Sequence, residues 1–190
     1  MEIILGTTSP YRREAFGFLG ISFKAEGSDV DESVVERDDP ETLVTILSRM
    51  KAEAVARRHP EAVVIGMDSV GYFDGRILEK PKSRKEAFDR LRALSGTGYK
   101  FYTGITMINT KTSRVIQRVV MTDIVMRELS DKEIDFYLDE DPSYNTYAHG
   151  YDPLGHSSSS FAKEIRGSYN NFLRGIPTEA MADMLKEIMS

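Results

Sequence analysis

Residues 2–16 read EIILGTTSPYRREAF, and this strand–loop–helix unit decides the fold. The apolar run in EIIL predicts a buried strand. Ser9 followed by Pro10 predicts a helix start, because serine caps helix N-termini and proline suits the first helical position. The first turn then carries Arg12 and Arg13, where carboxylates are normally favoured by about 0.3–1 kcal/mol each. A helix that opens with two arginines is suited to bind an anion.

After this unit, helices and strands alternate along the chain as far as two consecutive long strands at 99–109 and 113–126. Strands are predicted near 21–25, at 61–68, at 71–78 as a short hairpin, at 99–109 and 113–126 as an antiparallel pair, and at 161–165. Helices are predicted from Pro40, from Ser83 to about Leu94, from Ser130 to about Leu138, and after Pro177. The Ser-, Tyr- and Gly-rich region 139–175 is expected to be an ordered loop region. The order predicts an α/β fold with a mixed sheet flanked by helices.

Length and composition exclude several classes of protein. A chain of 190 residues, 41% hydrophobic and 29% charged, fits one globular domain over residues 1–190. No apolar run approaches the roughly 20 residues of a membrane span, so no membrane partner is expected. The N-terminus lacks the basic region of a signal peptide, which favours a cytoplasmic location. The chain has no cysteine, which excludes disulfides, a thiolate nucleophile and cysteine-ligated zinc.

Charge argues against a nucleic-acid polymer as partner. The net charge is −5 and the pI is near 5.3, whereas such proteins more often have a basic face. The three histidines do not have the spacing of a helical metal-ligand pair. A metal site, if present, is therefore expected to use oxygen ligands.

Charged residues at the ends of elements point to a phosphate site. The basic ones are Arg12, Arg13, Lys51, Lys80 and Lys82, and the acidic ones are Asp31, Glu32 and Asp68. Arginine pairs with phosphate oxygens through two parallel donors, and carboxylates can hold Mg²⁺ and orient water. Each residue alone has a simpler reading, as a solvated surface charge or, for Asp68, a strand-end cap. No G-x-x-x-x-G-K-[ST] loop occurs, so the pattern predicts only a nucleotide or phosphate-ester site.

Six short segments, taken in their order along the chain, indicate the function more specifically than the charge pattern does. They are TTSPYRREAF, VDESV, RMKAEAVA, VIGMDSV followed by DGRILEKP, LRALSG and IRGSYNNFLRGIP. Together they resemble the Maf family of nucleoside triphosphate pyrophosphatases. The resemblance implies an elongated α/β domain, related to inosine triphosphatases in fold, with a cleft between two lobes. It also implies hydrolysis of a nucleoside triphosphate to the monophosphate and pyrophosphate, as house-cleaning, with a divalent metal such as Mg²⁺ or Mn²⁺. A homodimer is a further expectation.

The resemblance also assigns roles to residues. Those expected to hold the phosphates are Ser9, Arg12, Arg13, Lys51 and Lys80. Glu32 and Asp68 are expected to act in catalysis and to bind the metal. The chain departs from the family at Thr7, Ser69 and Tyr99, and its late motif reads TYAHGYDPLGH.

Three positions are expected to select the base: Tyr11, Ser69 and Asp152. An aromatic residue and a carboxylate at the first and third follow the branch that acts on 7-methyl-GTP, not the dTTP and UTP branch. A carboxylate can accept from two N–H groups of guanine, and an aromatic face stacks on the cationic base. The alternative is that Asp152 starts a turn beside Pro153 and Tyr11 packs on its helix.

A second function remains open. The altered late motif is also compatible with a nucleotide-binding regulator of cell division or septation that does not turn its ligand over.

Overall fold

The computed structural model describes all residues from 1 to 190. The strands are β1 (Glu2–Gly6), β2 (Lys24–Glu26), β3 (Ala62–Phe73), β4 (Arg76–Leu78), β5 (Gly98–Asn109), β6 (Arg114–Met126) and β7 (Ala162–Arg166). The α-helices are α1 (Pro10–Gly17), α2 (Pro40–Ala56), α3 (Arg84–Leu94), α4 (Asp131–Glu140), α5 (Tyr169–Arg174) and α6 (Thr178–Met189). Three short 3₁₀ turns are η1 (Glu32–Val34), η2 (Tyr144–Thr146) and η3 (Ser157–Ser160).

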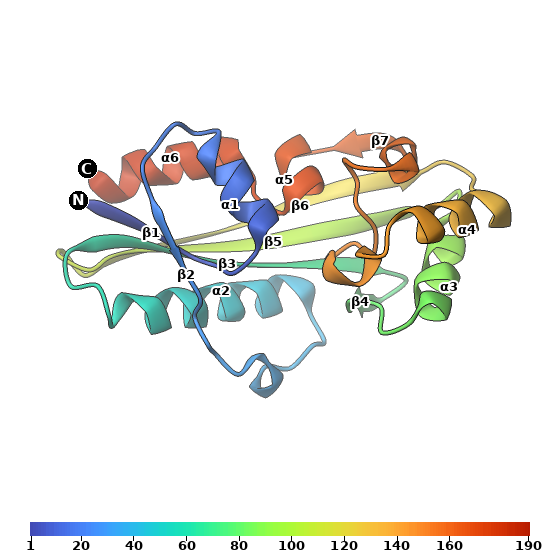
Figure 1. Cartoon of the computed structure of the whole chain (residues 1–190). Coiled ribbons are helices and arrows are strands. Elements are labelled where there is room, and N and C mark those ends of the chain that lie inside the picture. The colour runs from blue at the N-terminus through green and yellow to red at the C-terminus, as the bar shows by residue number, and fades with distance from the viewer.

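All seven strands belong to one mixed sheet, in the order β2-β1-β3-β5-β6-β7, with β4 paired to β3 (Figure 1). β1 runs parallel to β2 and β3, and the remaining pairs are antiparallel. The predicted mixed α/β fold is confirmed, as is the antiparallel pair of long strands. The strand predicted at 61–68 is too short. β3 is a single strand of 12 residues that continues into the predicted hairpin, because β5 pairs with it from Val63 to Tyr72.

Helix α2 packs on one face of the sheet, while α1 and α6 cover the other (Figure 1). Two glycines allow α2 to approach. A Cβ atom at Gly66 of β3 would clash with the carbonyl oxygen of Ser48, and one at Gly104 of β5 would clash with that of Val44. The backbone of α2 therefore lies directly against the sheet, which brings Lys51 close to β3.

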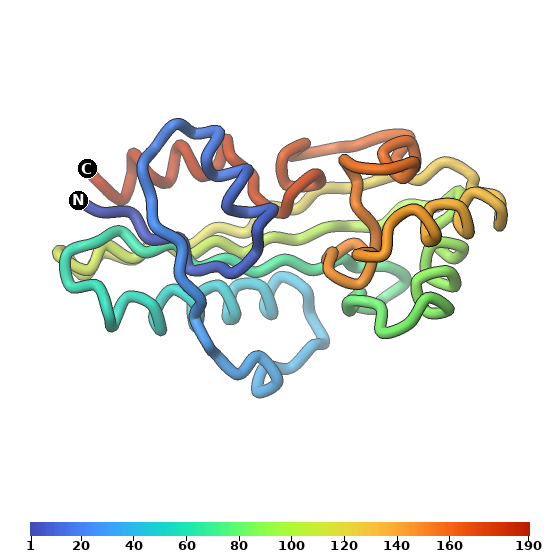
Figure 2. The backbone as a smooth tube through the Cα atoms, in the orientation of Figure 1, coloured from blue at the N-terminus to red at the C-terminus, as the bar shows by residue number.

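Two large apolar clusters lie at opposite ends of the elongated molecule (Figure 2). One joins β1, α1 and α6 and contains Leu5, Phe16 and Met184. The other joins α3, α4 and the chain around β7 and contains Leu91 and Tyr137. The long strands β3, β5 and β6 connect the two ends (Figure 1). No helix combines the length and apolar character that crossing a membrane requires.

Candidate active site

A cavity of about 1150 Å³ opens where β1 ends. β1 stops at Gly6, which pairs with Gly66 of β3, so Asp68 has β5 on one side and no β1 neighbour on the other. The carboxyl ends of parallel strands are where such folds commonly bind ligands. The chain leaving β1, the turn around η1 and the residues after α5 all line the cavity.

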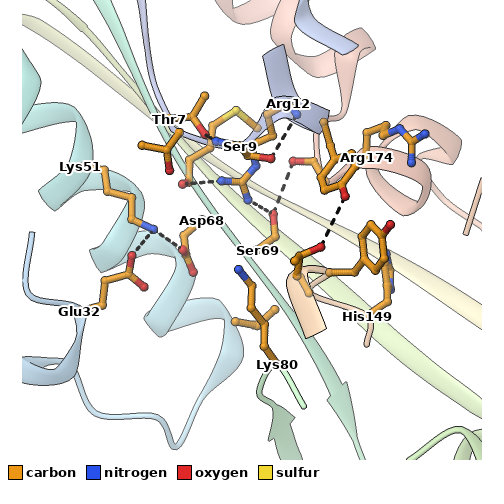
Figure 3. A pocket seen from close by; sticks show the side chains of 18 of the residues that line it. Thr7, Ser9, Arg12, Glu32, Lys51, Asp68, Ser69, Lys80, His149 and Arg174 are labelled. Atoms are coloured by element: carbon orange, nitrogen blue, oxygen red, sulfur yellow. Dashed lines mark hydrogen bonds and ion pairs between the residues drawn. The ribbon is translucent and has the colours of Figure 1, made fainter. Parts of the chain in front are cut away.

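A lysine joins two carboxylates at one wall of the cavity (Figure 3). Lys51 Nζ lies 2.6 Å from Asp68 Oδ1 and 2.8 Å from Glu32 Oε1. Asp31 caps the η1 turn by accepting from the backbone N–H of Ser33 at 3.0 Å, and this fixes the adjacent Glu32. The structure thus brings together three predicted site residues from separate segments.

Arg12 contributes a partly buried cation beside these carboxylates. Its guanidinium donates to the Met67 carbonyl oxygen at 3.2 Å and to Ser69 Oγ at 2.7 Å, and it forms no ion pair with a carboxylate. Burial lowers the pKa of Arg12, while the charges of Asp68 and Glu32 act in the opposite direction. A partly buried guanidinium without a direct counter-ion is suited to bind an anion.

The other predicted phosphate ligands divide into two groups. Ser9 lines the cavity and caps α1, with its hydroxyl accepting from the Arg12 N–H at 3.4 Å. Lys80 also lines it, forms no ion pair, and points toward Asp68 (Figure 3). Arg13 is exposed on α1 and does not line the cavity. It is on the outer side because consecutive helical residues point about 100° apart.

The two carboxylates suit a magnesium ion. No cluster of three or more His, Asp or Glu side chains capable of holding a metal is present. Mg²⁺ is usually held by one or two carboxylates together with substrate phosphates and waters. Glu32 and Asp68, held side by side by Lys51, match that donor set.

Ser69, predicted to select the base, contacts other protein groups. Its Oγ accepts from Arg12, lies 2.8 Å from Thr103 Oγ1, and lies 3.5 Å from the carbonyl oxygen of Gly175. It therefore orients the Arg12 guanidinium.

At the opposite end of the cavity, Tyr11 contacts the loop after α4. Its ring centroid lies 5.1 Å from that of Tyr147, and its hydroxyl lies 3.5 Å from Thr146 Oγ1. All three residues line the cavity, and we call this end the base end after the sequence-based prediction for Tyr11.

Asp152 is buried and does not line the cavity. Its Oδ1 accepts from Arg174 Nη1 at 2.9 Å and from the Leu154 N–H at 3.0 Å. The bond from the Leu154 N–H is the turn contact expected if Asp152 starts a turn beside Pro153, which was the alternative to a role in base selection. Arg174, at the end of α5, does line the cavity.

His149 lies in a buried chain of hydrogen bonds beside this end. Its Nε2 is 2.8 Å from the Phe172 carbonyl oxygen and its Nδ1 is 2.9 Å from Tyr99 Oη, which is 2.9 Å from Tyr151 Oη. The carbonyl can only accept, so Nε2 carries the proton and Tyr99 donates to Nδ1. Burial lowers the pKa of His149 to about 4 and raises that of Tyr99 well above its usual value. The imidazole is therefore neutral at physiological pH.

Sequence reasoning did not assign Arg174 or His149 to the site. Both come from the region predicted only as an ordered loop, which in fact contains the short helix α5. The available signals were that Arg174 lies in IRGSYNNFLRGIP, one of the six segments that carry the family resemblance, and that His149 lies in the late motif TYAHGYDPLGH.

The chain was compared with known proteins. It is 36% identical over 189 residues to a dTTP/UTP pyrophosphatase of Syntrophus aciditrophicus, covering 100% of this chain and 91% of that protein. It is 34% identical over 192 residues to a 7-methyl-GTP pyrophosphatase of Cupriavidus pinatubonensis, covering 98% and 92%. The fold is similar to that of a HAM1 protein from Coxiella burnetii, with a TM-score of 0.52 and 18% identity over 98% of this chain and 99% of that one. A family model described as Maf-like protein matches residues 2–188, and the chain belongs to this family.

Proposed function

We propose that this protein hydrolyses a nucleoside triphosphate to the monophosphate and pyrophosphate. The observation that carries the proposal is the partly buried guanidinium of Arg12, which has no carboxylate partner and lies next to the Glu32–Lys51–Asp68 cluster. Both relatives described above are named as nucleotide pyrophosphatases, which supports this reaction. The proposed cellular role is house-cleaning of unwanted nucleotides in the cytoplasm.

The proposed reaction breaks the bond between the α-phosphorus and the oxygen that bridges to the β-phosphorus. The oxygen of a water molecule bonds to the α-phosphorus, and pyrophosphate leaves with the bridging oxygen. Asp68 orients the water and accepts its proton, since a positioned carboxylate can act as general base. Glu32 shares the same lysine and supports Asp68 in this role.

Cations around the cavity stabilise the triphosphate. Arg12 and Lys80 line the cavity without carboxylate partners, and the N-terminus of α1, with its partial positive charge, lies at the same cavity. Because negative charge on the leaving pyrophosphate grows during the reaction, preorganised donors favour the transition state over the bound substrate.

We also propose that Glu32 and Asp68 hold a divalent cation, Mg²⁺ or Mn²⁺. When bound, such an ion neutralises phosphate charge and makes the α-phosphorus easier to attack. Lys51 keeps the two carboxylates together in its absence.

The choice of base needs a separate argument. The sequence favours 7-methyl-GTP through Tyr11 and Asp152, but that preference requires a carboxylate that reaches the base. Here Asp152 is paired with Arg174 and lies outside the lining of the cavity. The relatives are themselves named for two different kinds of base. The proposed reaction therefore does not depend on the base.

The test is to incubate the pure protein with Mg²⁺ and a panel of UTP, dTTP, GTP and 7-methyl-GTP. Equal amounts of nucleoside monophosphate and pyrophosphate are expected from at least one nucleotide. Orthophosphate with a nucleoside diphosphate would identify a phosphatase instead. Tight binding without any product would support the non-hydrolysing regulator.

A further inference from the structure

One charged residue at the base end of the cavity is an arginine, Arg174. Arg174 lines this end together with Tyr147 and His149, on the far side of Ser69 from Lys51 and Glu32 (Figure 3). Its side chain is only 15% exposed. Asp152, which pairs with Arg174 and does not line the cavity, is the carboxylate that the sequence analysis predicts to bind the base.

Several contacts hold Arg174 in place. Its Nη1 donates to Asp152 Oδ1 at 2.9 Å, and its Nε lies 3.8 Å from Glu14 Oε2. Its Cζ lies 5.5 Å from the centroid of the Tyr11 ring, within the range of a cation–π contact. These contacts join α1, the loop after α4 and the end of α5 around one guanidinium.

The same contacts withdraw Asp152 from the cavity. Its side chain is 9% exposed, and Oδ1 accepts from both Arg174 and the Leu154 N–H. A base that needs this carboxylate must first displace Arg174, and breaking a buried ion pair is costly. Nη1 of Arg174 also donates to the Leu173 carbonyl oxygen at 3.4 Å, whereas Nη2 donates no hydrogen bond within the chain.

We propose that Arg174 is a specificity-determining residue: it holds Asp152 away from the base and offers the base a positively charged hydrogen-bond donor. This proposal rests on the function proposed above. An arginine in this place favours an uncharged base with carbonyl oxygens on its edge, because those oxygens accept from Nη2. It disfavours 7-methylguanine, which is cationic and has lost the N7 acceptor. The preference is thus the reverse of that expected from Tyr11 and Asp152 alone.

The test compares kcat/KM for UTP with that for 7-methyl-GTP. The wild type is expected to favour UTP. In Arg174→Met the positive charge is gone and Asp152 is released, so the ratio is expected to move toward 7-methyl-GTP by about tenfold or more. In the double variant Arg174→Met/Asp152→Asn that gain is expected to disappear, since it requires the carboxylate.

Two further variants keep the test interpretable. Arg174→Gln removes the charge but retains an amide donor for Asp152, so it tests the effect of charge even if Arg174→Met unfolds. Arg118→Met is the matched control, because Arg118 pairs with Glu187 at 2.8 Å and does not line the cavity. It is expected to leave the ratio unchanged.

Two results would overturn the proposal: a wild type that prefers 7-methyl-GTP, or a ratio that is the same in wild type, Arg174→Met and Arg174→Gln. If no nucleotide is hydrolysed, the proposed function fails and Arg174 is tested separately. Calorimetry with UMP and 7-methyl-GMP then measures the ratio of dissociation constants, which is expected to shift in the same direction.

Discussion

Lys51 on α2 and Asp68 on β3, 17 positions apart in the chain, form an ion pair of 2.6 Å. The pair exists because α2 lies directly against the sheet at Gly66, two residues before Asp68. Both side chains are largely buried, at 12% and 11% exposed. Because little solvent reaches this ion pair, it holds the Asp68 carboxylate in a fixed orientation at the cavity.

Asp68→Asn is expected to lower kcat by about 10²-fold or more, the range for losing a positioned general base. The volume of the side chain hardly changes, so the folded state is expected to survive. Steady-state pyrophosphate release and a thermal melt check both statements. Asp135→Asn is a suitable control, because Asp135 pairs with Arg84 on the exposed surface. Nearly full activity in Asp68→Asn would remove the catalytic assignment.

Arg12→Ala and Arg13→Ala form a pair of neighbouring variants with different expected effects. Arg12 is partly buried and lines the cavity, so its loss is expected to raise KM and lower kcat together, by about tenfold or more each. Arg13 is exposed and outside the lining, so its loss is expected to change either constant by less than about threefold. Equal effects of the two variants would contradict the placement of Arg13.

Ser69→Ala distinguishes a role in orienting Arg12 from a role in selecting the base. The variant removes the hydroxyl that accepts from Arg12 at 2.7 Å. KM is expected to rise by about tenfold for UTP and 7-methyl-GTP alike, and Ser69→Thr, which keeps a hydroxyl, is expected to restore it. A change in the ratio of kcat/KM between the two nucleotides would instead support the sequence-based prediction of base selection.

Local signals explain why much of the fold was predictable. Ser9, Ser83 and Ser130 each cap a helix with their own side chain. Ser130 and Glu133 form a complete capping box, in which each side chain accepts from the backbone N–H of the other residue. Capping depends on residues within a few positions, so the sequence alone reveals it. Helix α5 was missed although Ser168 caps it, because its 6 residues are too few to show a helical apolar pattern; Asn171 also fixes it by donating to backbone oxygens of β5 and β6.

The site was only partly predictable for a related reason. Residue types identified Glu32, Lys51 and Asp68 as candidates, but only the topology brings them to one point. Asp152 and Arg174 are 22 positions apart, and no local pattern indicates that they pair. A carboxylate was therefore expected at the base, although an arginine is what lines the cavity.

The buried imidazole of His149 makes the stability of the protein depend on pH. Its pKa in the folded protein is about 4, below the usual 6.5, because burial disfavours the charged form. Between these values the unfolded chain binds a proton that the folded protein does not. The contribution of the neutral His149 to the free energy of unfolding is therefore fully present above pH 6.5. It is lost as pH falls toward 4, by up to about 1.4 kcal/mol per pH unit.

His149→Gln tests this dependence. The glutamine amide can still donate toward Phe172 and accept from Tyr99, but it cannot be protonated in this range. We expect the variant to be less stable than the wild type at pH about 7.5, and to lose less of its free energy of unfolding between pH about 7 and about 5. Urea unfolding at several pH values measures both slopes. All other titratable groups are shared, so the difference between the slopes isolates His149, and identical slopes would mean that the folded protein accepts the proton without cost.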